Sequence, residues 1–180
     1  MIARILHSTL FTILLAGSLI GQNNHELMVQ GELYITEGAE IFVKGDVHIE
    51  TSTAKLANSG KLSITGNLTK INQGQMQSNF QGLGSGKVIF ERKGGPIEEQ
   101  FIEGDFTLDE SFYDLVINNK GINNPVVYLK NGNVGVANVL TFLDGRIRTG
   151  DLNSSTLYQT LILYSGDPSA IQGSIPGNGH

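Results

Sequence analysis

Carboxylates are the most numerous side chains that could do chemistry in this 180-residue sequence, and they are concentrated in one segment. Seven of the 17 acidic residues fall within residues 98–114: Glu98, Glu99, Glu103, Asp105, Asp109, Glu110 and Asp114. Paired carboxylates can cleave polysaccharides, and carboxylate oxygens are ligands for Ca²⁺. The segment has no EF-hand spacing, and no basic residue stands between Lys93 and Lys120 to assist a lyase reaction. We therefore expect an acidic, solvated surface, with weak Ca²⁺ binding as an alternative at Asp105, Asp109, Glu110 and Asp114.

The histidines and cysteines give no sign of a catalytic centre. The four histidines are too far apart in sequence for metal-ligand spacing: His7, His25, His48 and His180. Alternation within Val47-His48-Ile49 is expected to direct His48 to solvent. Because the chain contains no cysteine, it has no thiolate ligand, disulfide or cysteine nucleophile. The sequence therefore predicts no enzyme, no catalytic residue and no cofactor other than the Ca²⁺ just considered.

Outward-facing tyrosines are candidates for binding rather than for catalysis. Strand alternation favours a solvent-facing position for several aromatic side chains, and the candidates are Tyr34, Tyr113 and Tyr128. Rows of rings on a ladder-like surface could stack against sugar rings, although single exposed aromatic residues are common in proteins of any function. An extracellular carbohydrate or another surface partner is the ligand class that these residues would suit.

The composition predicts an all-β protein rich in turns. Glycine is abundant at 23 residues, about twice its usual share of ~7%. The chain is 39% hydrophobic and 16% charged, which is too apolar for a disordered segment. Its formal net charge of −5 argues against nucleic-acid binding, which requires a basic surface.

Residues 1–21 have the pattern of a cleavable secretory signal. Arg4 and His7 precede an apolar stretch from Leu10 to Ile20, and small residues follow. The stretch is shorter than the ~20 residues needed to cross a bilayer, and no later run approaches that length. We therefore expect a secreted or cell-surface protein without a transmembrane segment, delivered by secretion machinery.

From residue 22 onward, apolar and polar residues alternate in very short stretches, as in strands with one buried face. Glycines between these stretches predict tight turns at Gly31, Gly38, Gly45, Gly60, Gly66, Gly86, Gly104, Gly132 and Gly145. Gly45 and Gly66 are 21 residues apart, Gly86 follows 20 residues later, and Leu62 follows Ile41 by 21. A coil of that length holding three short strands is typical of a parallel β-helix, in which aliphatic residues of successive coils form ladders.

The predicted β-helix covers residues 22–165. Residues 71–85, rich in Gln, Asn, Gly and Ser, are expected to protrude from it as a loop. Residues 166–180 are predicted to form a C-terminal tail or the start of a further coil, which leaves room for additional C-terminal domains. Asn131-Gly132 and Asp144-Gly145 could instead close hairpins, and they leave an antiparallel β-sandwich as the alternative fold.

Four stretches carry a likeness to known proteins: Gly86 to Phe90, Ile97 to Gly104, Ser111 to Asn119 and Val134 to Arg148. Together they resemble a block that recurs in repeat-rich surface proteins of bacteria that use type IX secretion. The resemblance covers most of residues 30–165 and implies a filamentous, adhesin-like protein. Its motifs are turn-and-strand patterns, so it implies an architecture and no particular activity.

Together these observations favour a secreted, non-catalytic structural or adhesive segment of a bacterial cell-surface protein that acts as a rigid β-solenoid spacer. The alternative is a β-helix that binds or cleaves carbohydrate through the acidic residues 98–114, because β-helices host both kinds of protein.

Overall fold

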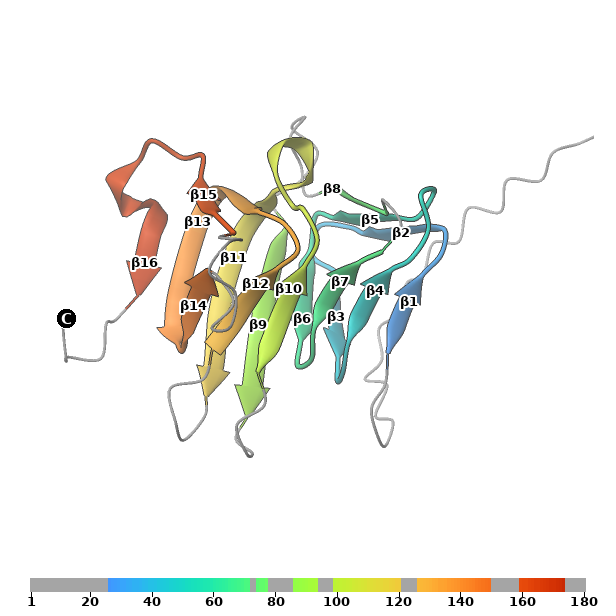
Figure 1. The fold of residues 1–180 in the computed structure, drawn as a ribbon, viewed down its shortest axis with the longest axis horizontal. Coiled ribbons are helices and arrows are strands. Elements are labelled where there is room, and N and C mark those ends of the chain that lie inside the picture. The colour runs from blue at the N-terminus through green and yellow to red at the C-terminus, as the bar shows by residue number, and fades with distance from the viewer. Residues whose placement is uncertain are drawn as a thin grey trace, which may run out of the picture.

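The computed structural model describes residues 26–71, 74–77, 86–93, 99–120, 126–149 and 159–173. Over these residues the chain forms a parallel β-solenoid in which each coil stacks on the previous one (Figure 1). Every pairing between two described strands is parallel. The predicted β-helix is therefore confirmed, and the antiparallel sandwich is wrong. The predicted signal, residues 1–21, lies outside the described residues.

Three sheets run along the solenoid. Sheet A contains β1 (Leu27–Val29), β4 (Val47–Ile49), β7 (Leu68–Lys70), β10 (Gln100–Glu103), β12 (Val126–Lys130) and β14 (Arg146–Thr149). Sheet B contains β2 (Glu32–Ile35), β5 (Lys55–Asn58) and β8 (Gln75–Gln77). Sheet C contains β3 (Glu40–Val43), β6 (Lys61–Ile64), β9 (Lys87–Lys93), β11 (Phe112–Lys120), β13 (Val134–Asp144), β15 (Leu161–Leu163) and, paired with β13, β16 (Ile171–Gly173). The described helices are two short 3₁₀ turns, η1 (Leu108–Glu110) and η2 (Pro168–Ala170).

The two dipeptides that were possible hairpin turns carry the chain from one sheet into another. Asn131-Gly132 joins β12 of sheet A to β13 of sheet C, and Asp144-Gly145 joins β13 to β14 of sheet A. Asn131 and Gly145 adopt positive φ angles of 54° and 88° at these bends. The hairpin interpretation is therefore wrong, because the strands on either side of each turn do not pair with each other.

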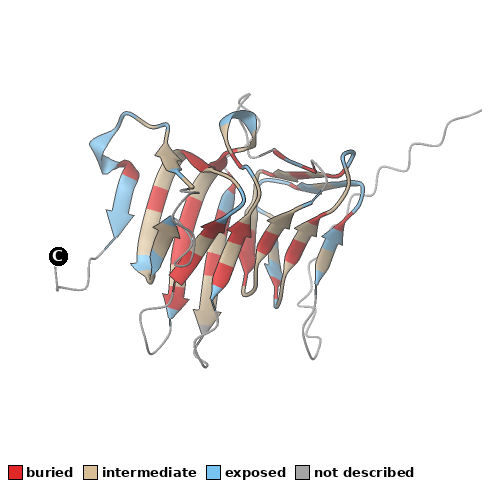
Figure 2. Ribbon diagram, viewed as in Figure 1, coloured by how far each residue is buried: buried red, intermediate tan, exposed pale blue. Residues whose placement is uncertain are grey.

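Aliphatic side chains form ladders through the interior. In sheet C, Leu62, Val88 and Leu115 occupy the same register position in successive coils, and all three are fully buried. Ile41 precedes Leu62 in this row, so the predicted step of 21 residues is confirmed. Buried positions line up across neighbouring strands in Figure 2. Each fully buried aliphatic side chain contributes about 1.5–3 kcal/mol, so the ladders are the main source of stability.

The coils differ in length, contrary to a uniform repeat. Lys87 N–H donates to Gly60 O at 2.8 Å, so Gly86 lies beside Gly60 of the previous coil. The predicted equivalence of Gly86 with Gly66 is therefore wrong, because additional residues between β8 and β9 lengthen this coil. All nine predicted turn glycines nevertheless stand between strands.

The third side of the solenoid changes along its length. The segment predicted to be a loop, residues 71–85, contributes β8, which pairs with β5; residues 72–73 and 78–85 lie outside the described residues. In the next coil η1 packs against β8 in place of a further strand. The rings of Phe106 and Phe112, on either side of η1, stack with centroids 5.4 Å apart. One coil later, β12 leads almost directly into β13, and two sheets remain.

Gly86→Ala should destabilise the solenoid, whereas Gly31→Ala should not. A Cβ at Gly86 would overlap the carbonyl oxygen of Asn58 in the preceding coil, while nothing lies within 4 Å of a Cβ at Gly31. We expect the free energy of unfolding to fall by about 1–3 kcal/mol or more for Gly86→Ala and to change by less than ~0.5 kcal/mol for Gly31→Ala. Denaturant unfolding followed by circular dichroism measures both, and equal effects would contradict the described packing.

Candidate functional site

The outward side of sheet A carries the side chains that could bind a ligand. Because the strands are parallel and in register, residues one coil apart lie side by side. One outward row consists of Glu26, Asp46, Asn67, Phe101, Tyr128 and Arg148. The adjacent row consists of Met28, His48, Thr69, Glu103 and Lys130. We call these two rows the sheet A face.

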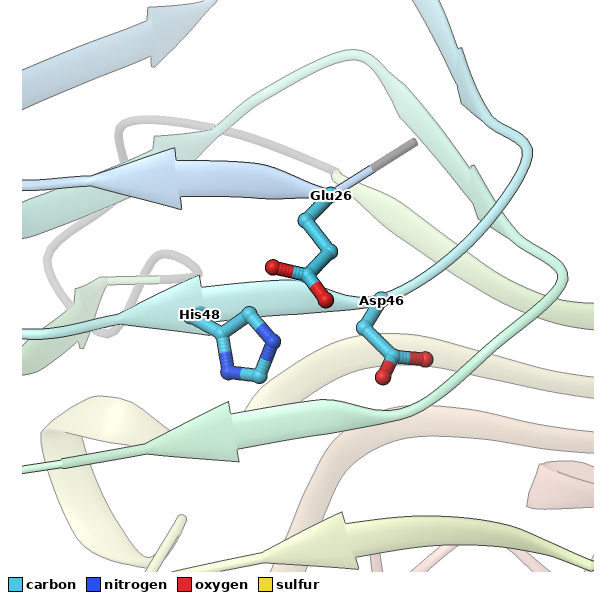
Figure 3. Close-up of side chains that lie close together, drawn as sticks. All are labelled: Glu26, Asp46 and His48. Atoms are coloured by element: carbon cyan, nitrogen blue, oxygen red, sulfur yellow. The ribbon is translucent and has the colours of Figure 1, made fainter. Parts of the chain in front are cut away.

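Glu26, Asp46 and His48 come together at the N-terminal end of the sheet A face (Figure 3). One potential ligand atom from each lies within 4.8 Å of the other two. Glu26 immediately precedes β1, while Asp46 and His48 stand on either side of the buried Val47 in the β4 region. Strand alternation therefore directs both toward the same side. Two carboxylates and one imidazole form a donor set that suits a divalent cation.

Asp46 is held in place by the following coil. Its Oδ1 accepts a hydrogen bond from the Asn67 backbone N–H at 2.7 Å, and its Oδ2 lies 3.4 Å from Nδ2 of the same residue. Asn67 Oδ1 in turn accepts from the Phe101 N–H at 2.8 Å. These polar contacts cross three coils and fix the orientation of the Asp46 carboxylate.

The sequence correctly predicts that His48 faces outward, but it does not predict the surroundings of the ring. The side chain lies in an outward row of sheet A, yet its ring is half-buried and Nδ1 is shielded from solvent without a hydrogen-bond partner. The imidazole also lies beside two carboxylates, a grouping that the spacing of the histidines does not reveal. The 20-residue offset between β1 and β4 places Glu26 next to Asp46. That offset, close to the repeat visible in the sequence, was the signal that could have found the group.

The C-terminal half of the sheet A face combines aromatic rings with cations. The rings of Phe101 and Tyr128, from neighbouring coils, have centroids 5.9 Å apart. Lys130 Nζ lies 3.3 Å from the Phe101 centroid, and the Arg148 guanidinium lies 5.9 Å from the Tyr128 centroid. Such cation–π contacts are attractive and hold the four side chains as a group. The group offers apolar ring edges beside positive charge on a protein whose net charge is −5.

The three tyrosines predicted to contact carbohydrate lie on three different sheets. Tyr128 is on sheet A, Tyr113 is half-buried in β11 of sheet C, and Tyr34 is in β2 of sheet B with 49% of its surface exposed. The Tyr34 hydroxyl donates to Glu32 at 2.7 Å, and this hydrogen bond raises the pKa of Tyr34 above its ordinary value. The three residues therefore do not form one binding site.

The structure does not gather the four predicted Ca²⁺ candidates, Asp105, Asp109, Glu110 and Asp114. Asp114 lies in β11, where Asn138 Nδ2 donates to it at 2.8 Å, whereas Asp109 is exposed in η1. Within the described ranges, no three of these carboxylates lie in reach of a common cation. Glu98, from the same acidic segment, lies outside the described residues.

Lys70 supplies the positive charge that the acidic segment lacks in sequence. Its ammonium group donates to the Glu110 carboxylate and to the Asp105 carbonyl oxygen, and it lies 5.2 Å from the centroid of Phe106. The side chains of Lys70 and Glu110 are 12% and 28% exposed. The ion pair therefore ties η1 to β7 and partly neutralises a surface that was predicted to be acidic and solvated. Because the partners are 40 residues apart, sequence spacing could not reveal the pair.

Comparison of the chain with protein-family models, curated proteins and solved structures gives no match in any of the three. Among the described residues, no helix is both long enough and apolar enough to cross a membrane. The functional argument therefore depends on the site geometry and on the sequence patterns described above.

Lys70→Met should destabilise the fold more than Lys61→Met, a matched change in a surface ion pair. Lys70→Met leaves the half-buried Glu110 without its cation, and hydrogen bonds to charged groups of this kind contribute about 1.5–3 kcal/mol. Lys61 pairs with Glu40 at 3.2 Å where both side chains are exposed, and such pairs contribute about 0–1 kcal/mol. Denaturant unfolding of the two variants tests the difference. Equal losses would show that Lys70 does not hold η1.

Proposed function

We propose that the chain is a rigid, non-catalytic segment of a secreted bacterial surface protein, and that it adheres to extracellular polysaccharide through the sheet A face. The adhesive part of the proposal is carried by one observation: Phe101, Tyr128, Lys130 and Arg148 place two aromatic rings and two cations together on the outward side of sheet A. A solenoid displays such a surface at a fixed spacing along its length.

Rigidity follows from the way in which the coils are joined. Every described coil is hydrogen-bonded to the next through parallel strands, and the buried ladders resist sliding because a shift of one residue would expose an entire aliphatic row. A segment of this kind keeps its two ends at a fixed separation and transmits mechanical force between them, and it needs neither a cavity nor a conformational change. This behaviour is what a spacer in a surface protein requires.

The ligand class follows from the chemistry of the sheet A face. The aromatic rings provide apolar edges that the C–H groups of sugar rings can contact, and Lys130 and Arg148 can pair with carboxylate or sulfate groups. An acidic polysaccharide offers both features in each repeating unit. The net charge of −5 makes this local cationic group a selective feature rather than a general property of the surface.

Export and cell-surface location are supported by the sequence pattern of residues 1–21 and by the resemblance to type IX surface proteins. Export and cell-surface location are therefore parts of the proposed function. The apolar stretch from Leu10 to Ile20 has the length and flanks of a secretory signal. The stretches between Gly86 and Arg148 resemble the strand-and-turn block that recurs in those surface proteins.

Binding to immobilised acidic polysaccharides tests the proposal. We expect the purified chain to bind, and Tyr128→Ala and Arg148→Ala to weaken binding by about tenfold or more, because truncation of an anchoring aromatic or arginine residue commonly costs that much. Tyr34→Ala, which removes an exposed ring from sheet B, is the matched control and should bind as the unaltered chain does. Equal binding by all variants would contradict the assignment to the sheet A face.

The same polysaccharides also test the alternative of a cleaving enzyme. We expect neither new reducing ends nor an increase in absorbance at 235 nm. Cleavage that disappears in Glu110→Gln would overturn the non-catalytic function in favour of the acidic segment.

A further inference from the structure

We propose that Glu26, Asp46 and His48 bind one divalent transition-metal cation, for which Zn²⁺ is the representative probe. The site would lie at the N-terminal end of the sheet A face and join the first coil to the second. The inference goes beyond the adhesive function and does not depend on it, because the aromatic and cationic residues of that function lie on β10, β12 and β14.

The donor set favours a transition metal over Ca²⁺ or Mg²⁺. Imidazole suits zinc and its neighbours, whereas Ca²⁺ and Mg²⁺ take oxygen ligands. A tetrahedral Zn²⁺ site has bonds of about 2.0–2.2 Å to nitrogen and oxygen, which places its ligand atoms about 3.4 Å apart. The three donors already lie within 4.8 Å of one another. Glu26 is exposed at the start of the described chain, and its long side chain can close the remaining distance by rotation.

Two of the three donors are positioned before any cation binds. The Asn67 N–H holds Asp46 Oδ1 at 2.7 Å, and such hydrogen bonds to a ligating carboxylate commonly orient it toward a metal. His48 lies in its outward row between Met28 and Thr69 of the adjacent coils. In Figure 3 one nitrogen of its ring faces the two carboxylates. A cation therefore has to draw in only Glu26.

The orientation of the His48 ring is a further observation that fits a ligand. In Figure 3 the nitrogen that faces the two carboxylates is Nε2, whereas Nδ1 points away from them. Nδ1 is shielded from solvent within the half-buried ring, so Nε2 is the nitrogen available to a cation. The imidazole is thus placed as a ligand would be, next to two carboxylates.

Binding would stabilise the outermost strand of sheet A. In the described structure β1 pairs with β4 and with no other strand, and edge strands open more readily than central ones. Glu26 stands at the start of β1, whereas Asp46 and His48 belong to the β4 region, so a shared cation would bridge the two coils. The Leu27 N–H, bonded to Asp46 O at 2.8 Å, lies directly beneath this bridge. Its hydrogen exchange should slow when the cation binds.

Zinc titration of the purified, untagged chain tests the inference. We expect one Zn²⁺ per chain by calorimetry, tetrahedral absorption bands when Co²⁺ replaces Zn²⁺, and slower exchange of the Leu27 amide. Glu26→Gln and His48→Gln, which preserve side-chain size, should each weaken binding by about tenfold or more. Glu37→Gln, an exposed carboxylate between β2 and β3 and outside the sheet A face, is the matched control and should leave Zn²⁺ binding unchanged.

Two results would overturn the site. One is the absence of heat and of cobalt bands up to about 1 mM metal, which corresponds to negligible affinity. The other is binding that persists in His48→Gln and disappears in His25→Ala, because the ligand would then be the histidine that precedes Glu26 in the sequence. Polysaccharide binding by Glu26→Gln and His48→Gln separates this inference from the proposed function. The adhesive residues, such as Tyr128, are unchanged in these variants, so loss of Zn²⁺ binding leaves the adhesive proposal untouched.

Discussion

The stacking of each coil on the previous one in parallel register is the interaction on which the rest of the structure depends. Backbone hydrogen bonds fix the neighbour of every residue one coil away, and this fixes the side chains on both sides of each sheet at once. Inside, Leu62, Val88 and Leu115 form an aliphatic row. Outside, the same register places Asp46 beside Asn67 and Phe101 beside Tyr128. Core stability and surface chemistry therefore have one cause.

The register also explains where the solenoid departs from a regular repeat. The interior can accept a longer coil only if the additional residues leave the stack and the next strand returns to register. This happens before Gly86, where Asn58 holds the corner by donating to Lys87 O at 3.1 Å and accepting from the Gly60 N–H at 3.1 Å. It happens again around η1, where Lys70 and the stacked rings of Phe106 and Phe112 fill the third side. Buried polar groups at these bends serve to return the chain to its stack.

The local part of this account could be predicted from the sequence, and the long-range part could not. Alternation and turn glycines are local signals, and they correctly predicted strands such as β3, β6 and β9, the glycine corners and the 21-residue step from Ile41 to Leu62. They missed β8, which lies in the segment predicted to be a loop. The equivalence of Gly86 with Gly66 was wrong because a uniform repeat cannot anticipate a longer coil. Contacts across coils, such as that between Lys70 and Glu110, require the register itself, and the group around His48 escaped notice for the same reason.

Disulfide trapping measures the register most directly, because the chain has no cysteine of its own. Lys61 and Lys87 are paired in register across β6 and β9, and paired strands lie about 4.8 Å apart, within the roughly 4.4–6.8 Å that a disulfide spans between Cα atoms. The account predicts that Lys61→Cys/Lys87→Cys forms an intramolecular disulfide in the folded chain, and that Asn67→Cys/Lys87→Cys, which follows a uniform 20-residue repeat, does not. Cross-linking of the second pair in place of the first would contradict the stacking described above.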